Sequence, residues 1–371
     1  MTLFISAVAF LILLSVLVII HELGHFFAAK EAGVVVEEFG FGLPPKAMHL
    51  FVWKGTKFTL NWIPFGGFVR LKGENLERES DRHVRGSFSA ASIPARIVIL
   101  TAGVAMNFLF AMLLFTIGFS VGRWIPTYLD YEGLQAAAAR GEVHMVPAVL
   151  IDELVPEGTA QAAGVSVPSI LTHVNGQPIT SPGEVSAIQK GRREVTYTLL
   201  AGEALDQEQT ITLPIGEDGI TGVMLRPFPR ELSAPIRSPL SAAYYSLREA
   251  HIMTVQTILG MKQLVVSLFS RGSVPEGVTG IVGIAELTHM SVQDGFMTYL
   301  RLVAILSLSL AVLNILPLPA LDGGRLVFVL AELIRRRPAN RKFEVTTNLV
   351  GFLVLIGLIL IITYNDIIKL F

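Results

Sequence analysis

The chain has 371 residues, of which 52% are hydrophobic and only 16% are charged. This composition is typical of an integral membrane protein with room for a water-soluble module. The formal net charge of −1 gives no indication of a nucleic-acid partner. Because the chain has no cysteine, disulfides and thiolate metal ligands are excluded, and any bound metal must be held by histidine and carboxylate groups.

The first predicted element is an apolar helix from Thr2 to about Phe27, which contains His21-Glu22-Leu23-Gly24-His25. Two histidines four residues apart share one helix face and can bind one Zn²⁺, while Glu22 can act as general base on the water that the metal activates. Ionisable groups at membrane depth are costly, so their presence suggests function. A chance match and a signal peptide are the alternatives, but the first ten residues lack the Lys or Arg of a signal peptide.

Val34 to Leu71, directly after this helix, predicts a β-hairpin. Phe51-Val52-Trp53 and the run from Phe58 to Ile63 are rich in β-branched and aromatic residues, and Lys54-Gly55 predicts the turn between them. So apolar a hairpin is expected to dip towards the membrane. A soluble cytoplasmic hairpin is the alternative.

A second apolar span runs from Ile97 to Val121. Over residues 145–229 the sequence consists instead of short runs rich in β-formers, separated by glycines typical of turns. The strands are predicted over Val149–Val155, Ile170–Val174, Val195–Leu200 and Thr210–Pro214. A short helix ends at Gly164, and Asn175-Gly176 predicts a tight turn. This pattern predicts a separate α+β domain.

The third span, Leu302 to Leu321, carries Pro317 and Pro319 near its end and is followed by Asp322. Two prolines so close cannot lie in an undisturbed helix, so the backbone is expected to unwind. Unwound backbone at membrane depth is tolerated only where it is buried in protein or lines a wet cavity. Asp322 is therefore a candidate third metal ligand, and the alternative is that it caps the helix expected over Arg325–Ile334.

Basic residues orient the chain. They are absent before the first span, follow it closely, and recur at Arg335–Arg337 before the fourth span, Val345 to Tyr364. By the positive-inside rule both loops are cytoplasmic, and both termini and the α+β domain lie outside the cytoplasm, across an inner (plasma) membrane. The stretch Ile252–Phe269 carries Lys262 in its middle, which favours an amphipathic helix on the membrane surface. Asp322 reaches the depth of the histidines only if this stretch does not cross.

The predicted fold is thus a polytopic α-helical membrane protein with four transmembrane helices, a membrane-associated β-hairpin and an inserted extracytoplasmic α+β domain. Its parts are residues 1–30 (first span and zinc motif), 31–95 (cytoplasmic-side loop and hairpin), 96–122 (second span), 145–229 (α+β domain), 230–295 (linker and amphipathic helix, with a glycine-rich turn at 277–283), 296–334 (third span) and 343–366 (fourth span).

His21–His25 and the Asn-x-x-Pro-x-Pro-x-Leu-Asp-Gly pattern from Asn314 to Gly323 together resemble the site-2 proteases, zinc intramembrane proteases of bacterial regulated intramembrane proteolysis. Thr101–Phe108 looks like the family's second-span motif, with Val104 where the family usually has proline, and Pro64–Val69 matches its glycine-rich stretch. The order of the external strands resembles a PDZ domain of the bacterial protease type, although Val167-Pro168-Ser169 stands where the family usually has Gly-Asp.

The resemblance implies a re-entrant β element beside the active site, and an exposed strand edge there, near Gly66 and Gly67, could pair with an unwound substrate segment. Asn314 and Asn107 are candidates for hydrogen bonds to the substrate backbone or the developing oxyanion. A structural role bridging the broken backbone is an equal alternative for both asparagines. For the PDZ-like domain, peptide binding and steric exclusion of long ectodomains both stay open.

These expectations combine into zinc-assisted peptide hydrolysis within the lipid bilayer, with His21, His25 and Asp322 as ligands and Glu22 as general base. By resemblance, the substrate is a single-span membrane protein already trimmed by another protease: a signalling protein or a remnant signal peptide. A metal transporter and an inactive PDZ-bearing scaffold are the alternatives. The chain has no internal repeat of the kind that transporters usually show, and a scaffold has no need of Glu22.

Overall fold

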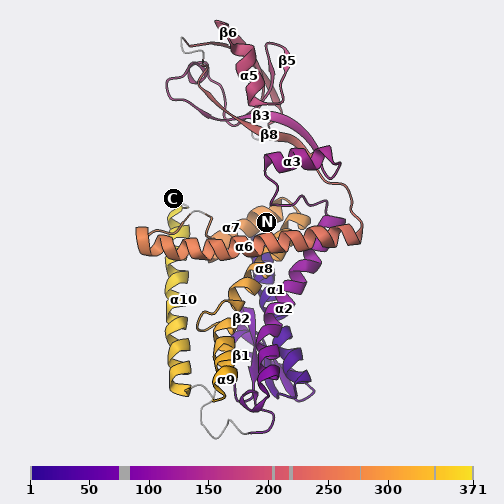
Figure 1. Cartoon of the computed structure of the whole chain (residues 1–371), viewed down its shortest axis with the longest axis vertical. Helices are drawn as coiled ribbons and strands as arrows, with labels where there is room; N and C mark the ends of the chain where they lie inside the picture. Colours follow the sequence, from indigo (N-terminus) through magenta and orange to yellow (C-terminus); the bar gives the residue numbers. More distant parts are fainter. Residues whose placement is uncertain are drawn as a thin grey trace. The chain divides into compact units, whose positions relative to one another are not determined.

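A computed structural model of the chain describes residues 2–74, 84–202, 205–216, 220–275, 277–337 and 340–369. The chain forms two compact units: Met1–Gly122 with Ser238–Phe371, called the membrane unit below, and Arg123–Arg237, called the β-rich unit (Figure 1). The membrane unit contains α1 (Thr2–Glu31), β1 (Val36–Trp53), β2 (Thr56–Leu71), the 3₁₀ turn η2 (Phe88–Ala90), α2 (Ile93–Ser120), α6 (Pro239–Arg271), α7 (Ile281–Gln293), α8 (Phe296–Ile315), α9 (Asp322–Arg335) and α10 (Arg341–Lys369). The β-rich unit contains α3 (Tyr131–Ala139), β3 (His144–Leu154), α4 (Thr159–Ala162), β4 (Ser169–Val174), β5 (Gln177–Pro178), α5 (Pro182–Gln189), β6 (Glu194–Ala201), β7 (Gln207–Pro214) and β8 (Val223–Ser233).

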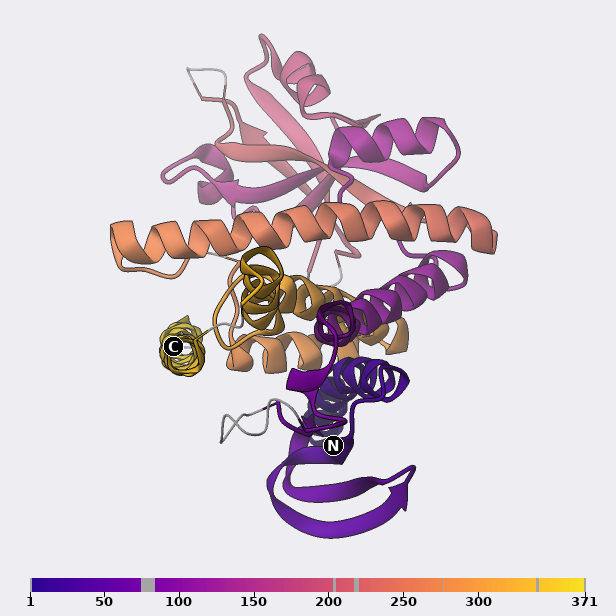
Figure 2. The ribbon, with the colours of Figure 1, turned by 60° about the horizontal axis from the view of Figure 1, so that its bottom comes forward.

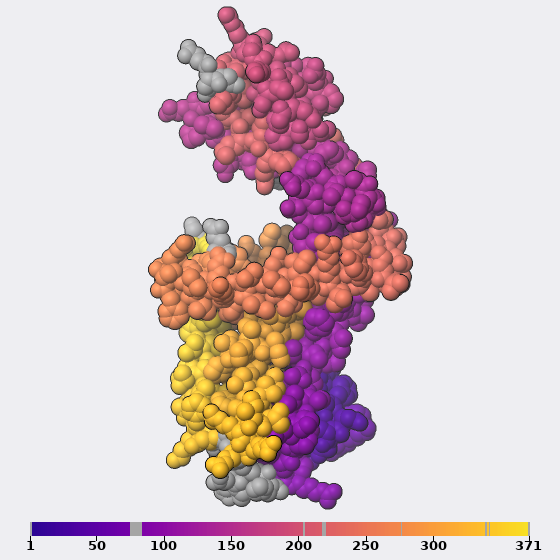
Figure 3. Space-filling view, in the orientation of Figure 1, coloured from indigo at the N-terminus to yellow at the C-terminus, as the bar shows by residue number. Residues whose placement is uncertain are grey.

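Five helices in the described part of the chain are long and apolar enough to cross a membrane, namely α1, α2, α6, α8 and α10. Many of their large apolar side chains are exposed, which is stable only against lipid or a partner. The chain is therefore a multi-pass membrane protein with a β domain, as predicted. One of the five differs in direction: α6 runs crosswise to α10 in both ribbon views and forms a continuous band across the membrane unit (Figures 1, 2 and 3).

Helices α1 and α2 pack at close range because each presents a glycine to the other. A Cβ atom on Gly24 would lie 2.8 Å from Gly103 Cα, and one on Gly103 would lie 2.5 Å from His25 Nε2. Small residues allow helix backbones to approach within a membrane. On another side of α2, Ser307 Oγ of α8 donates a hydrogen bond of 2.9 Å to the carbonyl oxygen of Asn107. Helix α2 is thus held between the two helices that carry the predicted motifs.

The third span is broken where its prolines predicted. Helix α8 ends at Ile315 and α9 begins at Asp322, and Ala320 between them has a φ of 72°. Helix α10 supports this break, because Asn348 Oδ1 accepts a hydrogen bond of 3.2 Å from Ala320 N–H. A Cβ atom on Gly351 would lie 2.7 Å from the carbonyl oxygen of Pro319, so α10 also packs tightly on the loop.

The predicted hairpin is present as β1 and β2, with both turn residues, Lys54 and Gly55, at positive φ. Its pairing is more complex than that of a simple hairpin, because Phe39 of β1 faces Phe58 near the start of β2 and also Val69 near its end. The last part of β2 therefore returns beside β1. There it also contacts α1.

The β-rich unit is one antiparallel sheet in the order β7-β6-β4-β3-β8, and β5 pairs with β4. Its strands include the four predicted runs. Strand β8 was not predicted. It contains Pro227 and Pro229, and among the described strands it pairs with β3 at the sheet edge, where proline is tolerated. Tyr197 and Leu171 are among the fully buried side chains of its core.

Helix α7 is the main element of the membrane unit that differs from expectation. The glycine-rich segment 277–283 was predicted to be a turn, but α7 begins inside it at Ile281. The amides of Gly280 and Gly283 donate hydrogen bonds of 2.8 and 3.0 Å to Asp366 Oδ2 of α10. A carboxylate at a helix N-terminus satisfies unpaired amides and complements the helix dipole. This cap comes from a residue far along the chain.

Candidate metal centre

Three side chains from α1 and the start of α9 converge in the membrane unit. Asp322 Oδ2 lies 2.9 Å from His21 Nε2 and 3.3 Å from His25 Nε2, and the two Nε2 atoms lie 3.0 Å apart. His21 and His25 are buried, and Asp322 is partly buried. The structure thus brings together the three residues that were predicted from the sequence as metal ligands.

The protonation of His25 indicates that a cation fits this cluster. His25 Nδ1 lies 2.8 Å from the carbonyl oxygen of Ile99, which can only accept, so Nδ1 carries the proton. In the neutral ring the lone pair of Nε2 then faces His21 Nε2 and the Asp322 carboxylate. Ligands bonded to a tetrahedral Zn²⁺ at about 2.0–2.1 Å lie roughly 3.3 Å apart, near the distances found here.

The alternative role of Asp322, as a helix cap, finds no support in its contacts. The N-cap position of α9 is Leu321, and no side chain there makes a capping hydrogen bond. Asp322 instead directs Oδ2 towards the two histidines. The turn that allows this is crowded, because a Cβ atom on Gly323 would lie 2.5 Å from the carbonyl carbon of Ile315.

Glu22 lies on the hairpin side of the cluster. Its Oε2 accepts a hydrogen bond of 2.9 Å from the backbone N–H of Val69 on β2. A Cβ atom on Gly67 would lie 4.0 Å from Glu22 Cγ and 2.9 Å from the carbonyl oxygen of Gly40, so this strand passes close to the side chain of Glu22. Glu22 shares a cavity of about 190 Å³ with the three cluster residues. The cavity is lined by His21, Glu22, His25, Phe68, Val69, Leu71, Glu74, Ile99, Leu100, Asp322 and Arg325.

The two asparagines occupy different places. Asn107 is fully buried on α2, and its amide nitrogen lies 3.5 Å from His21 Nδ1. Turned by 180°, the amide would offer its oxygen to an N–H at His21 Nδ1. Asn107 is therefore placed to orient His21. Asn314 lies half-buried in the last turn of α8 and does not line the 190 Å³ cavity, and a substrate contact by either asparagine stays a prediction.

Gly66 and Gly67 precede the part of β2 that lines the cavity. Gly66 has a φ of 78°, which favours glycine, and a Cβ atom there would meet only the side chain of Leu43, at 3.6 Å or more. Phe68 and Val69, and not the two glycines, line the cavity. The predicted role of the glycines in substrate pairing is untested by these contacts.

Two charged residues of the cavity, Arg325 and Glu74, were not predicted. Arg325, one turn after Asp322 on α9, forms an ion pair with Glu74 beyond the end of β2. The one sequence feature that could have indicated Arg325 is its position directly after Asp322-Gly323-Gly324. Helix α9 is also tied to α2, because Arg96 donates hydrogen bonds of 2.9 and 2.8 Å to the two carboxylate oxygens of Glu332.

Two helical histidines and a carboxylate, with a glutamate in the same cavity, form the arrangement of a metallopeptidase centre. The model of Peptidase family M50 matches residues 9–358. The chain therefore belongs to this family and is a metalloprotease of the site-2 protease type, as its motifs predicted.

Relatives match along almost the whole chain. A protein of Clostridium perfringens whose name describes a zinc metalloprotease is 30% identical over 96% of this chain and 97% of its own length. The zinc metalloprotease RasP of Geobacillus kaustophilus is 27% identical over 99% of this chain and 98% of its own length. A Campylobacter jejuni protein, also named as a zinc metalloprotease, is 30% identical over 98% of this chain and 93% of its own length.

Proposed function

We propose that this chain is an intramembrane zinc metalloprotease that hydrolyses a peptide bond within the transmembrane segment of a single-span membrane protein. The observation that carries the proposal is the convergence of His21, His25 and Asp322 in a cavity shared with Glu22. His21 and His25 lie on α1, which is long and apolar enough to cross a membrane. A substrate already trimmed by another protease, either a signalling protein or a remnant signal peptide, is the finer part of the proposal and rests on the family resemblance.

His21 Nε2, His25 Nε2 and the Asp322 carboxylate would hold Zn²⁺. When bound, the metal supplies Lewis-acid chemistry that lowers the pKa of water and polarises the scissile carbonyl. Glu22 removes a proton from the attacking water and delivers it to the leaving amine as the C–N bond breaks. The hydrogen bond from Val69 N–H holds Glu22 Oε2 towards the hairpin, so Oε1 is the oxygen free to turn towards that water.

The end of β2 is the proposed docking edge for the substrate. Val69 is paired with Phe39 within the sheet, and its N–H points to Glu22, so the outer edge of this segment faces the cavity. A helical peptide bond has its carbonyl engaged in the helix, and hydrolysis needs an extended segment. An unwound substrate strand that adds to this edge would place its backbone beside Glu22.

We also propose that four helices cross the membrane and that α6 lies on its surface. The support is the crosswise direction of α6 relative to α10 (Figures 1 and 2) and the charge of Lys262 within the apolar stretch Ile252–Phe269 of α6. The termini and the β-rich unit are then extracytoplasmic on an inner (plasma) membrane. The antiparallel sheet with α4 and α5 is compatible with a PDZ-like domain, which either binds peptide or excludes large ectodomains.

The test compares release of a soluble fragment from a co-expressed single-span candidate substrate between the wild-type chain and Glu22→Gln. The glutamine is isosteric but cannot take up the proton, so cleavage should fall by about 10²–10⁴-fold while zinc content is retained. Glu286→Gln, at an exposed position on α7 and outside the cavity, should cleave normally. Cleavage by Glu22→Gln at the wild-type rate would contradict the role of Glu22 as general base.

A further inference from the structure

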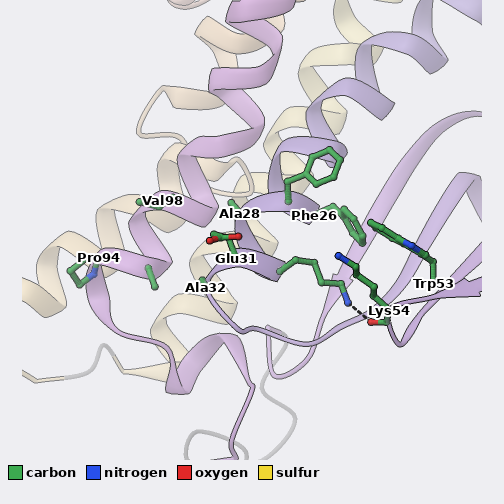
Figure 4. A pocket seen from close by; sticks show the side chains of 11 residues that line it. Phe26, Ala28, Glu31, Ala32, Trp53, Lys54, Pro94 and Val98 are labelled. Atoms are coloured by element: carbon green, nitrogen blue, oxygen red, sulfur yellow. Dashed lines mark hydrogen bonds between the residues drawn. The ribbon is translucent and has the colours of Figure 1, made fainter.

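A second and larger pocket lies at the end of α1, away from the metal centre. It has a volume of about 730 Å³ and opens between the last turns of α1, the hairpin turn and the first turns of α2 (Figure 4). It is lined by Phe26, Phe27, Ala28, Lys30, Glu31, Ala32, Trp53, Lys54, Pro94, Ala95 and Val98. None of these residues lines the 190 Å³ cavity, so the pocket is not part of the metal site.

Its walls are apolar and face outward. Phe27, Trp53 and Val98 are 53%, 44% and 57% exposed. Phe26 stacks on Trp53 with ring centroids 6.0 Å apart, which fixes the hairpin turn against α1 (Figure 4). On helices of this hydropathy, such exposure is stable against hydrocarbon chains and costly against water. The walls therefore suit an acyl chain.

Its rim is positively charged. Lys30 Nζ donates a hydrogen bond of 2.9 Å to the carbonyl oxygen of Lys54 and lies 5.7 Å from the centre of the Phe26 ring (Figure 4). Lys54 Nζ lies 5.0 Å from the centre of the Trp53 ring. Within the described residues, neither ammonium group has a carboxylate within ion-pair distance, and Glu31 is the one acidic residue of the lining. Two ammonium groups beside an apolar groove match a lipid phosphate attached to acyl chains.

We propose that this pocket binds an anionic phospholipid, with its phosphate at Lys30 and Lys54 and an acyl chain along Phe27 and Val98. The last turns of a transmembrane helix lie where headgroups meet hydrocarbon, so a lipid can satisfy both parts of the pocket at once. The bound lipid would connect α1, the hairpin turn and α2. It would thereby stabilise the hairpin whose other end contacts Glu22 through Val69.

The test uses the purified full-length chain in detergent, with native mass spectrometry after addition of phosphatidylglycerol or phosphatidylcholine. The wild type should retain phosphatidylglycerol preferentially. Each lysine near a lipid headgroup contributes roughly fivefold in affinity, so the double variant Lys30→Gln/Lys54→Gln should lose the preference by about 25-fold. Lys57→Gln, an exposed hairpin lysine outside the pocket lining, is the matched control and should behave as wild type.

A second variant tests the groove without changing charge. Ala95→Trp places an indole in the pocket and should reduce phosphatidylglycerol retention although both lysines remain. Equal retention of the two lipids by the wild type would overturn the proposal, and so would undiminished retention by both the double variant and Ala95→Trp. A thermal stabilisation by inorganic phosphate as large as that by phosphatidylglycerol would also overturn it, because a free anion would then suffice.

Discussion

Each histidine of the metal cluster uses one nitrogen for the cluster and has the other next to a group on α2. His25 Nδ1 is hydrogen-bonded to the carbonyl oxygen of Ile99, and His21 Nδ1 lies beside the side-chain amide of Asn107. Partners of this kind fix the tautomer and orientation of a metal-binding imidazole. Helix α2 contributes none of the three converging side chains, but it determines where the two imidazole lone pairs point.

Replacing Asn107 distinguishes an orienting role from a substrate contact. We expect Asn107→Ala to weaken zinc binding by about 10–100-fold, because the ring of His21 loses its partner. Chelator competition on the purified chain measures this, with Asn365→Ala on α10 as the control. An unchanged zinc affinity with a raised KM would assign Asn107 to the substrate instead.

Replacing Asp322 tests the third ligand. Asp322→Ala should lower zinc affinity by more than about 100-fold, since loss of a ligand exceeds the loss of an outer partner. The measurement is metal content after gel filtration. Asp294→Ala changes an exposed aspartate after α7 and should leave zinc bound. Full occupancy in Asp322→Ala would remove this residue from the metal site.

Gly103 tests the close approach of α2 to the cluster. In Gly103→Ala the new methyl group would lie 2.5 Å from His25 Nε2 and 2.7 Å from His21 Cε1, so either the helices separate or the imidazoles turn. We expect a loss of about 1–3 kcal/mol in stability together with reduced zinc content. Gly357→Ala on α10, where a Cβ atom meets nothing within 4 Å, is the control. Normal zinc binding and stability in Gly103→Ala would contradict the packing described.

At the scale of elements, the break between α8 and α9 depends on α10. Gly351→Val would force a side chain into the loop at Pro319, because a Cβ atom on residue 351 would lie 2.7 Å from the carbonyl oxygen of Pro319. We expect this change to shift Asp322 and to lower zinc content and proteolysis together. Gly357→Val, further along α10, should lower neither. If Gly351→Val keeps both, the loop does not need α10.

Apolar length and proline positions, which are local features of the sequence, predicted most of the membrane helices and the break in the third span. The length of apolar runs predicted α1, α2, α8 and α10, and two prolines predicted the break before Asp322. The start of helix α7 was not predicted because its N-terminal amides are capped by Asp366 of α10, and the sequence next to α7 contains no capping residue that would indicate it. Strand β8 was missed because its prolines are tolerated only through its edge position.

In the metal site, too, local sequence signals predicted some features, whereas contacts between distant segments were not predicted. The spacing of His21 and His25 and the position of Asp322 predicted a cluster that the structure assembles. The hydrogen bond from Val69 to Glu22 and the ion pair between Arg325 and Glu74 were not predictable. The hydrogen bond arises because β2 returns beside α1, and the ion pair arises because Glu74, just beyond the end of β2, meets Arg325 of α9. No spacing along the chain specifies either approach.

At the scale of the whole molecule, the direction of α6 decides the number of crossings. The chain has no cysteine, so single cysteines report their side of the membrane without background. Pro235→Cys and Ser273→Cys flank α6 and should both react with an impermeant maleimide from outside the cytoplasm. Ser92→Cys before α2 should react only after permeabilisation. Labelling of Pro235→Cys and Ser273→Cys from opposite sides would show that α6 crosses.

The support that α10 gives to the broken span has a consequence for biosynthesis. The two histidines are synthesised before Asp322, and Asp322 before Asn348 and Gly351 of the helix that holds its loop. A nascent chain therefore carries two donors that cannot close a three-donor site. We therefore expect zinc to be captured only after α10 has been synthesised.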